Sequence, residues 1–322
     1  MVVKIVLSHI HFYFMRHQPL TRKDVKFGLL SSDNAFLSYF PNQFTQRTML
    51  ARFQVNNTLP KYVEFVKKPV YTVFGLLSKL CPLLLRAKVF QQGKKILATQ
   101  SNIGVIATEC ISKKKEYVII IYNGADSAHS SDLVDVHFIL NISRSNVSSF
   151  RWTVLELNNE VTNPYAVWKT FGMPAYPTAE QFYLMKKQED PHIRGPWRLS
   201  SFSPWKFHLN ILNPGVTLIN ICESGRKLKR VKNLRYLQIR NTTIQISWQD
   251  IGNRCILTYY VEYSPFKHGA YVKVNTDKIL FPSYYHTCYD NETECRMKGF
   301  YRIYAVDFWS KHGPFSEPLH VT

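Results

Sequence analysis

Acidic residues are scarce in this sequence of 322 residues, because 22 Asp and Glu stand against 41 Lys and Arg and the formal net charge is +19. So positive a chain attracts polyanions, which include nucleic acids and sulfated polysaccharides. The sequence has no zinc-finger spacing, no RNA-binding signature and no glycine-rich phosphate loop, so we expect no nucleic-acid partner. Scattered, solvated lysines explain the charge equally well. A polyanion-binding surface and an ordinary solvated surface therefore both remain open as interpretations. Basic clusters recur at Lys67–Lys68, Lys94–Lys95, Lys113–Lys115, Lys186–Lys187 and Arg226–Lys232.

Long apolar runs are also missing. No stretch approaches the roughly 20 apolar residues that a membrane-spanning helix needs, so we expect no membrane span. The first fifteen residues are apolar, but Lys4, His9 and His11 interrupt them and no small-x-small cleavage site follows. This pattern favours a helix over about residues 1–15 and no signal peptide. Hydrophobic residues make up 45% of the chain, which is enough for two or three folded domains.

The six cysteines are not spaced as a metal-binding knuckle, so we expect neither a metal ion nor another cofactor. Cys288 and Cys295 bracket a polar tip, which predicts a small disulfide across the end of a hairpin. Cys81 and Cys110 are expected to be separate packed thiols. Together with five Asn-x-Ser/Thr sequons, the cysteines favour the secretory pathway. The expected glycosylation sites are Asn56, Asn141, Asn146, Asn241 and Asn291.

The C-terminal hundred residues have the clearest strand pattern. Apolar side chains alternate with polar ones over 242–248, 257–263 and 301–305, with a tryptophan early in the segment and tyrosines late. Strands at this spacing predict a sandwich of about seven strands, and the pattern resembles a fibronectin type III domain over residues 226–322.

The middle of the chain, residues 84–225, is also rich in short apolar or alternating runs separated by turns. One helix interrupts them, because Thr178 and Gln181 have the spacing of a capping box and Asp190–Pro191 ends the helical pattern. Phe182, Leu184 and Met185 are expected to form its apolar side. We therefore predict a second β-sandwich in this segment.

Residues 1–83 differ from the rest, since a helix, a short apolar strand, a polar loop and a second helix at about 68–80 follow one another. These elements make one and a half units of an α/β fold. They cannot cover both faces of a parallel strand by themselves. The sequence therefore predicts apolar faces left bare in this stretch.

Four separated blocks occur at Leu29–Tyr39, at Gln46–Thr58, at Tyr176–Phe182 with Glu189–Pro191, and at Tyr301–Trp309 with Gly313–Pro318. In their order and spacing they resemble the α-L-iduronidase family, which is glycoside hydrolase family 39. The likeness runs from about residue 28 to the end and includes Met1–Val6, whereas residues 10–27 depart from the family pattern.

The resemblance implies a (β/α)8 barrel, then a β-sandwich, then a fibronectin-like domain. Residues 1–83 would be the last part of the barrel, 84–225 the β-sandwich and 226–322 the fibronectin type III-like domain. The fold expected for this chain is therefore mainly β, with barrel strands one to seven absent. The resemblance also implies a disulfide between Cys222 and Cys255, which would join the last two domains.

The family's activity implies a retaining glycosidase that removes terminal α-L-iduronate from dermatan sulfate and heparan sulfate in the lysosome. Such an enzyme needs two carboxyl groups roughly 5 Å apart. Neither family glutamate has a counterpart here, and the Asn159–Glu160 dipeptide lies in the sandwich, where we expect a solvated turn. We therefore expect no catalytic residue in this chain and no activity from it alone.

Two residues of this chain match sugar-binding residues of the family. Arg47 matches the arginine that grips the uronate carboxylate, a role that suits the planar, bidentate guanidinium. Asp33 matches the aspartate that helps to hold the terminal sugar. A structural Asp–Arg pair is the alternative for both. The alternative for the whole chain is a secreted, non-catalytic protein whose β domains bind glycosaminoglycan.

Overall fold

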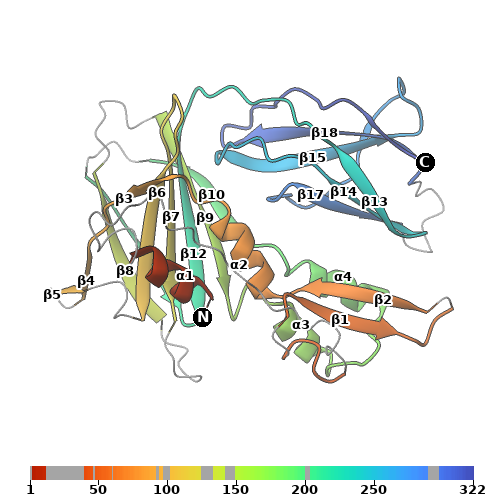
Figure 1. Cartoon of the computed structure of the whole chain (residues 1–322), viewed down its shortest axis with the longest axis horizontal. Coiled ribbons are helices and arrows are strands. Elements are labelled where there is room, and N and C mark those ends of the chain that lie inside the picture. The colour runs from red at the N-terminus through yellow and green to blue at the C-terminus, as the bar shows by residue number, and fades with distance from the viewer. Residues whose placement is uncertain are drawn as a thin grey trace.

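The computed structural model is mainly β, as the sequence predicts, and its strands form two sandwiches with a hairpin beside them (Figure 1). A six-stranded sheet is the centre of the first sandwich, and a smaller sandwich contains the C-terminus. The residues described by the structure are 2–11, 40–45, 48–59, 61–91, 94–96, 102–124, 133–141, 149–199, 204–288 and 297–322.

The central sheet is antiparallel throughout and has the strand order β10-β9-β12-β7-β6-β3. Its inner strands β7 and β12 are nearly continuous apolar runs, because both of their faces are covered. The strands are β3 (Leu83–Leu85), β6 (Ile103–Glu109), β7 (Glu116–Asn123), β9 (Phe150–Asn158), β10 (His192–Arg198) and β12 (Gly215–Glu223).

One face of the central sheet packs against the two-stranded sheet of β8 (Leu133–Leu140) and β11 (Trp205–Leu212). Their side chains alternate between the core and the outside, as expected for strands with one covered face. A separate short hairpin consists of β4 (Val89–Gln91) and β5 (Lys94–Ile96). The buried residues of this layer are Ile119, Ile121, Phe150, Val154, Leu199, Trp205, Leu209, Ile211, Ile219 and Ile221.

The other face of the central sheet is covered by helices α1 (Val2–Ile10) and α2 (Pro69–Leu77) (Figure 1). Leu7 and Leu76 are among the most deeply buried residues in this core. The expectation of bare apolar faces was therefore wrong for these two helices, because the central sheet covers their apolar sides. In the described part of the chain, no helix is both long and apolar enough to cross a bilayer.

A β-hairpin lies at residues 50–67, where the sequence had predicted only a polar loop. Strands β1 (Leu50–Val55) and β2 (Tyr62–Lys67) pack on helices α3 (Pro164–Thr170) and α4 (Ala179–Lys186). The capping box at the start of α4 is confirmed, because Thr178 Oγ1 accepts from the Gln181 amide and the Gln181 side chain accepts from the Thr178 amide. Phe182 and Met185 are buried as expected, but Leu184 is 38% exposed.

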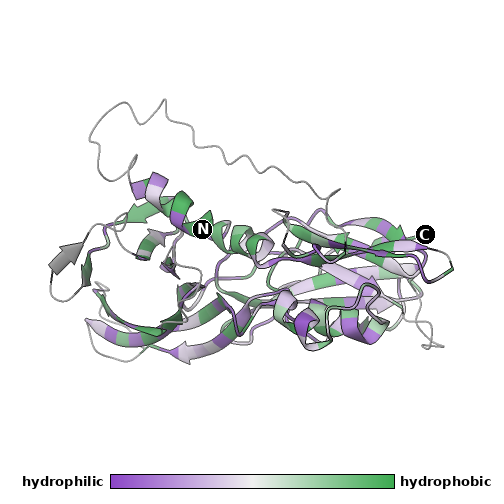
Figure 2. Cartoon of the chain, turned by 90° about the horizontal axis from the view of Figure 1, so that it is seen from below, coloured by the Kyte–Doolittle hydropathy of each residue, from purple (hydrophilic) through white to green (hydrophobic). Residues whose placement is uncertain are grey.

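The C-terminal unit is a seven-stranded sandwich, in agreement with the strand pattern. One sheet has the order β13-β14-β17 and the other β16-β15-β18-β19. Hydrophobic and hydrophilic residues are interspersed along its strands (Figure 2), and the buried ones form a core between the two sheets. The strands are β13 (Arg235–Arg240), β14 (Thr243–Ser247), β15 (Ile256–Ser264), β16 (Val272–Lys273), β17 (Ser283–Thr287), β18 (Gly299–Asp307) and β19 (Leu319–Val321).

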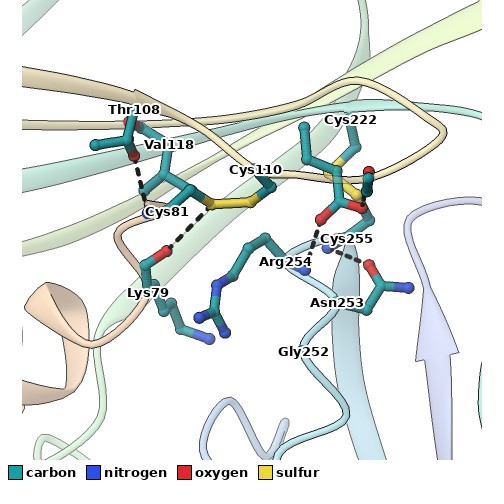
Figure 3. Close-up of a disulfide and its surroundings, with 12 residues drawn as sticks. Lys79, Cys81, Thr108, Cys110, Val118, Cys222, Gly252, Asn253, Arg254 and Cys255 are labelled. Carbon is teal, nitrogen blue, oxygen red and sulfur yellow. Dashed lines mark hydrogen bonds between the residues drawn. A yellow bond between two sulfur atoms is a disulfide. The ribbon is translucent and has the colours of Figure 1, made fainter. Parts of the chain in front are cut away.

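Two disulfides lie near the boundary between the sandwiches (Figure 3). Cys222, in β12, is joined to Cys255, just before β15, with their Cα atoms 5.7 Å apart. Cys81 is joined to Cys110, with their Cα atoms 4.7 Å apart, so the expectation of separate thiols was wrong. The cause is the pairing of β3 with β6, which sets Leu83 opposite Glu109 and brings the two cysteines together. Cys288 is also disulfide-bonded, and Cys295 lies outside the described residues.

Helix α2 also touches the C-terminal unit. A Cβ atom at Gly75 would lie 2.6 Å from the ring of Phe281, so the helix and this ring are in direct contact. The Lys79 ammonium donates to the Leu280 carbonyl at 3.1 Å, and Leu280 belongs to the core that α1 and α2 form on the central sheet. One apolar core therefore includes residues of all three segments expected from the sequence.

We predict that Gly75→Ala destabilises the protein by about 1 kcal/mol, because overpacking against Phe281 outweighs the usual helix preference of alanine. Urea unfolding measures the difference. In a double-mutant cycle, Gly75→Ala should cost much less stability in a chain that also has Phe281→Leu, because the smaller side chain leaves room for the added methyl group. A Gly75→Ala variant that is more stable than the wild type would contradict the close packing.

Candidate functional site

The two residues assigned to the sugar site, Asp33 and Arg47, lie outside the described residues. The structure does describe the chain on both sides of position 47. Phe44 and Thr48 are each attached to the rest of the molecule, and Gln43 is buried with 2% of its surface exposed.

Phe44 attaches the loop to an aromatic cluster. Its ring centroid lies 6.0 Å from that of Phe53 in β1, 5.5 Å from Tyr165 and 5.4 Å from Trp168 in α3. Trp168 is almost fully buried, and its indole N–H donates to the Pro174 carbonyl at 3.0 Å. Aromatic pairs at these separations stabilise a fixed arrangement of the rings. The loop is thus held on its N-terminal side by the hairpin and by α3.

Thr48 holds the loop on its C-terminal side. Its hydroxyl donates to the Leu50 carbonyl at 2.6 Å and accepts from the Lys68 ammonium at 2.6 Å. Lys68 is itself buried, with 5% of its surface exposed, and its amide donates to the Met49 carbonyl. A buried ammonium retains its charge only where it makes hydrogen bonds of this kind. This role was not predicted from the sequence, although Lys68 stands directly before Pro69, which begins α2.

Carboxylates of the described residues mostly serve as partners of Lys and Arg. Glu64 in β2 pairs with Lys186 of α4 at 2.6 Å and with Arg240 of β13, so it joins the hairpin, the helix pair and the C-terminal unit. The Arg240 guanidinium also lies over the Tyr62 ring, 4.4 Å from its centroid. This ion-pair network fixes the hairpin relative to both sandwiches.

Two carboxylates, those of Glu189 and Asp190, lie close to Lys67. Their proximity raises the question of whether they could be the two catalytic carboxyl groups of a retaining glycosidase. The Lys67 ammonium lies 3.5 Å from Glu189 and 3.2 Å from Asp190, and the Lys67 amide donates to Glu189 at 2.8 Å. Burial lowers the pKa of Lys67, but attraction by Asp190 and Glu189 outweighs it, so the pKa ends above its usual value. Burial raises the pKa of Glu189, and Lys67 offsets part of this rise. A lysine between the two groups favours a structural joint over acid–base chemistry.

Glu160, which shares the family's Asn–Glu dipeptide, is exposed in the turn after β9. The Asn158 side chain accepts from the amides of Glu160 and Val161 at 2.8 and 3.0 Å, which makes an Asx turn. The solvated turn expected here is therefore what the structure has. In the ranges that the structure describes, no cluster of His, Cys, Asp or Glu could hold a metal ion.

The sequons that can be located lie at the surface. Asn56 is exposed at the end of β1, and Asn141 and Asn241 are exposed at the ends of β8 and β13. Asn146 and Asn291 lie outside the described residues. Exposure is the condition that a glycan requires, since the attached sugar is bulky and hydrated.

Two protein-family models match this chain. The family model "Glycosyl hydrolases family 39" matches residues 1–202, and the model "Alpha-L-iduronidase C-terminal domain" matches residues 232–322. Since the first match covers more than half of the chain, the protein belongs to glycosyl hydrolase family 39. The resemblance found in the sequence is thereby confirmed.

Curated proteins with similar sequences are alpha-L-iduronidases. The chain is 32% identical over 329 residues to the alpha-L-iduronidase of Mus musculus, a match that covers 99% of this chain and 50% of the relative. It is 32% identical over 327 residues to the Homo sapiens alpha-L-iduronidase, covering 99% of this chain and 48% of that protein. The chain thus spans about half the length of these relatives.

A solved structure, the bacterial orthologue of human α-L-iduronidase, has a similar fold. It superposes with a TM-score of 0.73 and covers 100% of this chain and 53% of that chain, with 18% of residues identical. At this identity the likeness establishes the fold alone.

We predict that Lys68→Met loosens the attachment of the loop and lowers the free energy of unfolding by about 1–2 kcal/mol, because Thr48 loses a charged hydrogen-bond donor. Lys61→Met, at an exposed position of the hairpin, is the matched control and should change stability by less than about 0.5 kcal/mol. Equal effects of the two substitutions in urea unfolding would contradict the anchoring role of Lys68.

Proposed function

We propose that this chain provides part of a retaining α-L-iduronidase that removes terminal iduronate from dermatan sulfate and heparan sulfate. Membership of family 39, with similarity to alpha-L-iduronidases over 99% of the chain, carries the proposal. In this assignment Arg47 and Asp33 form one edge of the sugar pocket.

Arg47 is proposed to bind the carboxylate of the iduronate. A guanidinium can donate two parallel hydrogen bonds to a carboxylate, which fixes the orientation of the sugar as well as its charge. The anchors at Phe44 and Thr48 on either side of the loop support this role, because a binding residue has to be held in a defined position. Asp33 would accept hydrogen bonds from the sugar hydroxyls.

The acid/base and the nucleophile are proposed to come from polypeptide other than residues 1–322. A retaining mechanism needs two carboxyl groups roughly 5 Å apart with access to the sugar. Glu64, Glu116 and Glu189 are buried in ion pairs, which leaves them unsuited to that task. We therefore propose that the chain alone does not turn over an iduronide.

The sequons and the disulfides are consistent with a secreted or lysosomal protein. We propose glycans at the exposed residues Asn56, Asn141 and Asn241, and also at Asn146 and Asn291. A lysosomal location is proposed because the similar proteins are α-L-iduronidases. A disulfide between Cys288 and Cys295 is part of the same proposal.

The test uses a fluorogenic α-L-iduronide and two proteins. We predict no turnover by the purified chain, and turnover by a fusion that adds the part of the Mus musculus relative that this chain does not match. In the fusion, Arg47→Ala should lower kcat/KM about a hundredfold, because a bidentate charged interaction is lost. Arg47→Lys, which retains the charge but not the planar fork, should recover only part of it.

Turnover by the chain alone that Arg47→Ala abolishes would contradict the proposed absence of the catalytic pair. An active fusion that Arg47→Ala does not affect would contradict the assignment of Arg47.

A further inference from the structure

The segment between the two sandwiches, residues 226–232, has no strand or helix and follows the surface of the C-terminal unit (Figure 1). Its apolar residues point inward, since Val231 is buried and a Cβ atom at Gly313 would lie 3.1 Å from Leu228. Lys227 and Lys229, on the two sides of Leu228, are exposed. In an extended chain their Cα atoms are about 7 Å apart.

Two further basic segments lie beside this linker. The turn between β6 and β7 contains Lys113 and Lys114, and the Lys114 side chain reaches within 3.3 Å of the Cβ position at Gly225. The loop after β18 contains Lys311, which stands two residues before the Gly313 that contacts Leu228. We call the exposed lysines Lys113, Lys227, Lys229 and Lys311 the basic strip.

The acidic groups beside the basic strip already have partners. Glu223 lies 3.6 Å from Lys114, Glu116 pairs with Arg226, and Glu317 pairs with Arg230. Among the residues that the structure places, none of the four strip lysines forms an ion pair within 4.0 Å. The nearest described carboxylate at Lys311 is Asp307, which accepts from the Lys311 amide at 2.9 Å and not from its ammonium. Within the described ranges, the positive charge of the strip is therefore not neutralised by an ion pair.

Three further cations, Arg226, Arg254 and Lys79, lie near the boundary between the sandwiches, where Glu116 pairs with Arg226 and Asp250 pairs with Arg254. The Arg226 guanidinium donates to the Gly252 carbonyl at 3.2 Å, and the Arg254 amide donates to Glu116. Burial, and to a lesser extent the nearby Arg254, lower the pKa of Lys79 to about 8, although Asp250 offsets part of the shift (Figure 3). Burial and Arg254 lower the pKa of Arg226 in the same way. Cations at this boundary thus repel one another, and an anion bound nearby would relieve that repulsion.

We propose that the basic strip binds the sulfate groups of a sulfated glycosaminoglycan. Compact ammonium groups on flexible stems suit point contacts with sulfates along a linear polymer. The choice of polysaccharide as the polyanion rests on the proposed function, whereas the presence of an anion site rests on the charge arrangement alone. The strip would hold a long chain while its terminal sugar is processed elsewhere.

The test measures binding of size-fractionated dermatan sulfate to the purified chain at several salt concentrations. Lys227→Gln with Lys229→Gln should weaken binding about tenfold at low salt and reduce the ion contacts derived from the salt dependence by about two. The matched control is Lys61→Gln with Lys206→Gln, which removes two exposed lysines of the hairpin and of β11 and should change affinity less than twofold. Both double variants should melt at the wild-type temperature.

Three outcomes would overturn the proposal. Equal losses in the two double variants would mean that net charge, and not the strip, attracts the polymer. Equal binding of unsulfated chondroitin would remove the role of sulfate. Single-stranded DNA of matched charge that binds more tightly through the same lysines would assign the strip to nucleic acid. None of these measurements depends on turnover, so the result is separate from the test of Arg47.

Discussion

The contact of helix α2 with two surfaces at once is the constraint on which the rest of the structure depends. Val73 and Leu76 bury against the central sheet, and Gly75 lets the ring of Phe281 approach the backbone of the helix. Because residues of the first segment, the first sandwich and the C-terminal unit share one apolar core, none of them has to cover its own surface alone. Burial at roughly 25 cal/mol per Å² of apolar area makes this shared core the main source of cohesion between the segments.

Charge plays a second and more specific part. Glu64, Glu116 and Glu189 are buried at the places where segments far apart in the sequence meet, and each is paired with Lys or Arg. Removing one partner of such a pair is costly, since a buried charge is left without compensation. The scarce acidic groups are therefore largely committed to joints within the fold. Among the described residues, the exposed linker residues Lys227 and Lys229 have no such carboxylate partner.

Strand patterns could be predicted where one face of a sheet is buried and the other is solvated, as in β14, β15 and β18, and the capping box of α4 could be predicted because its contacts are local. The β1–β2 hairpin was missed because its strands mix apolar residues with charged ones, of which Glu64 and Lys67 are held by partners distant in sequence. The pairing of Cys81 with Cys110 depends on the register of β3 and β6, which spacing alone does not determine. Asp33 and Arg47 were predicted as sugar-site residues by resemblance to the family. The anchoring by Lys68 and by the aromatic cluster depends on tertiary contacts, which the sequence does not reveal.

The central claim is that the described segments are joined through α2 into one cooperative unit. Native-state hydrogen exchange of the purified chain tests it most directly, by comparing the amides of α2 with those of β12 and β15 as a function of denaturant. The account predicts that the slowest amides of all three elements exchange with the same opening free energy and the same denaturant dependence. Exchange of the α2 amides at a much lower free energy, while β12 and β15 remain protected, would contradict it.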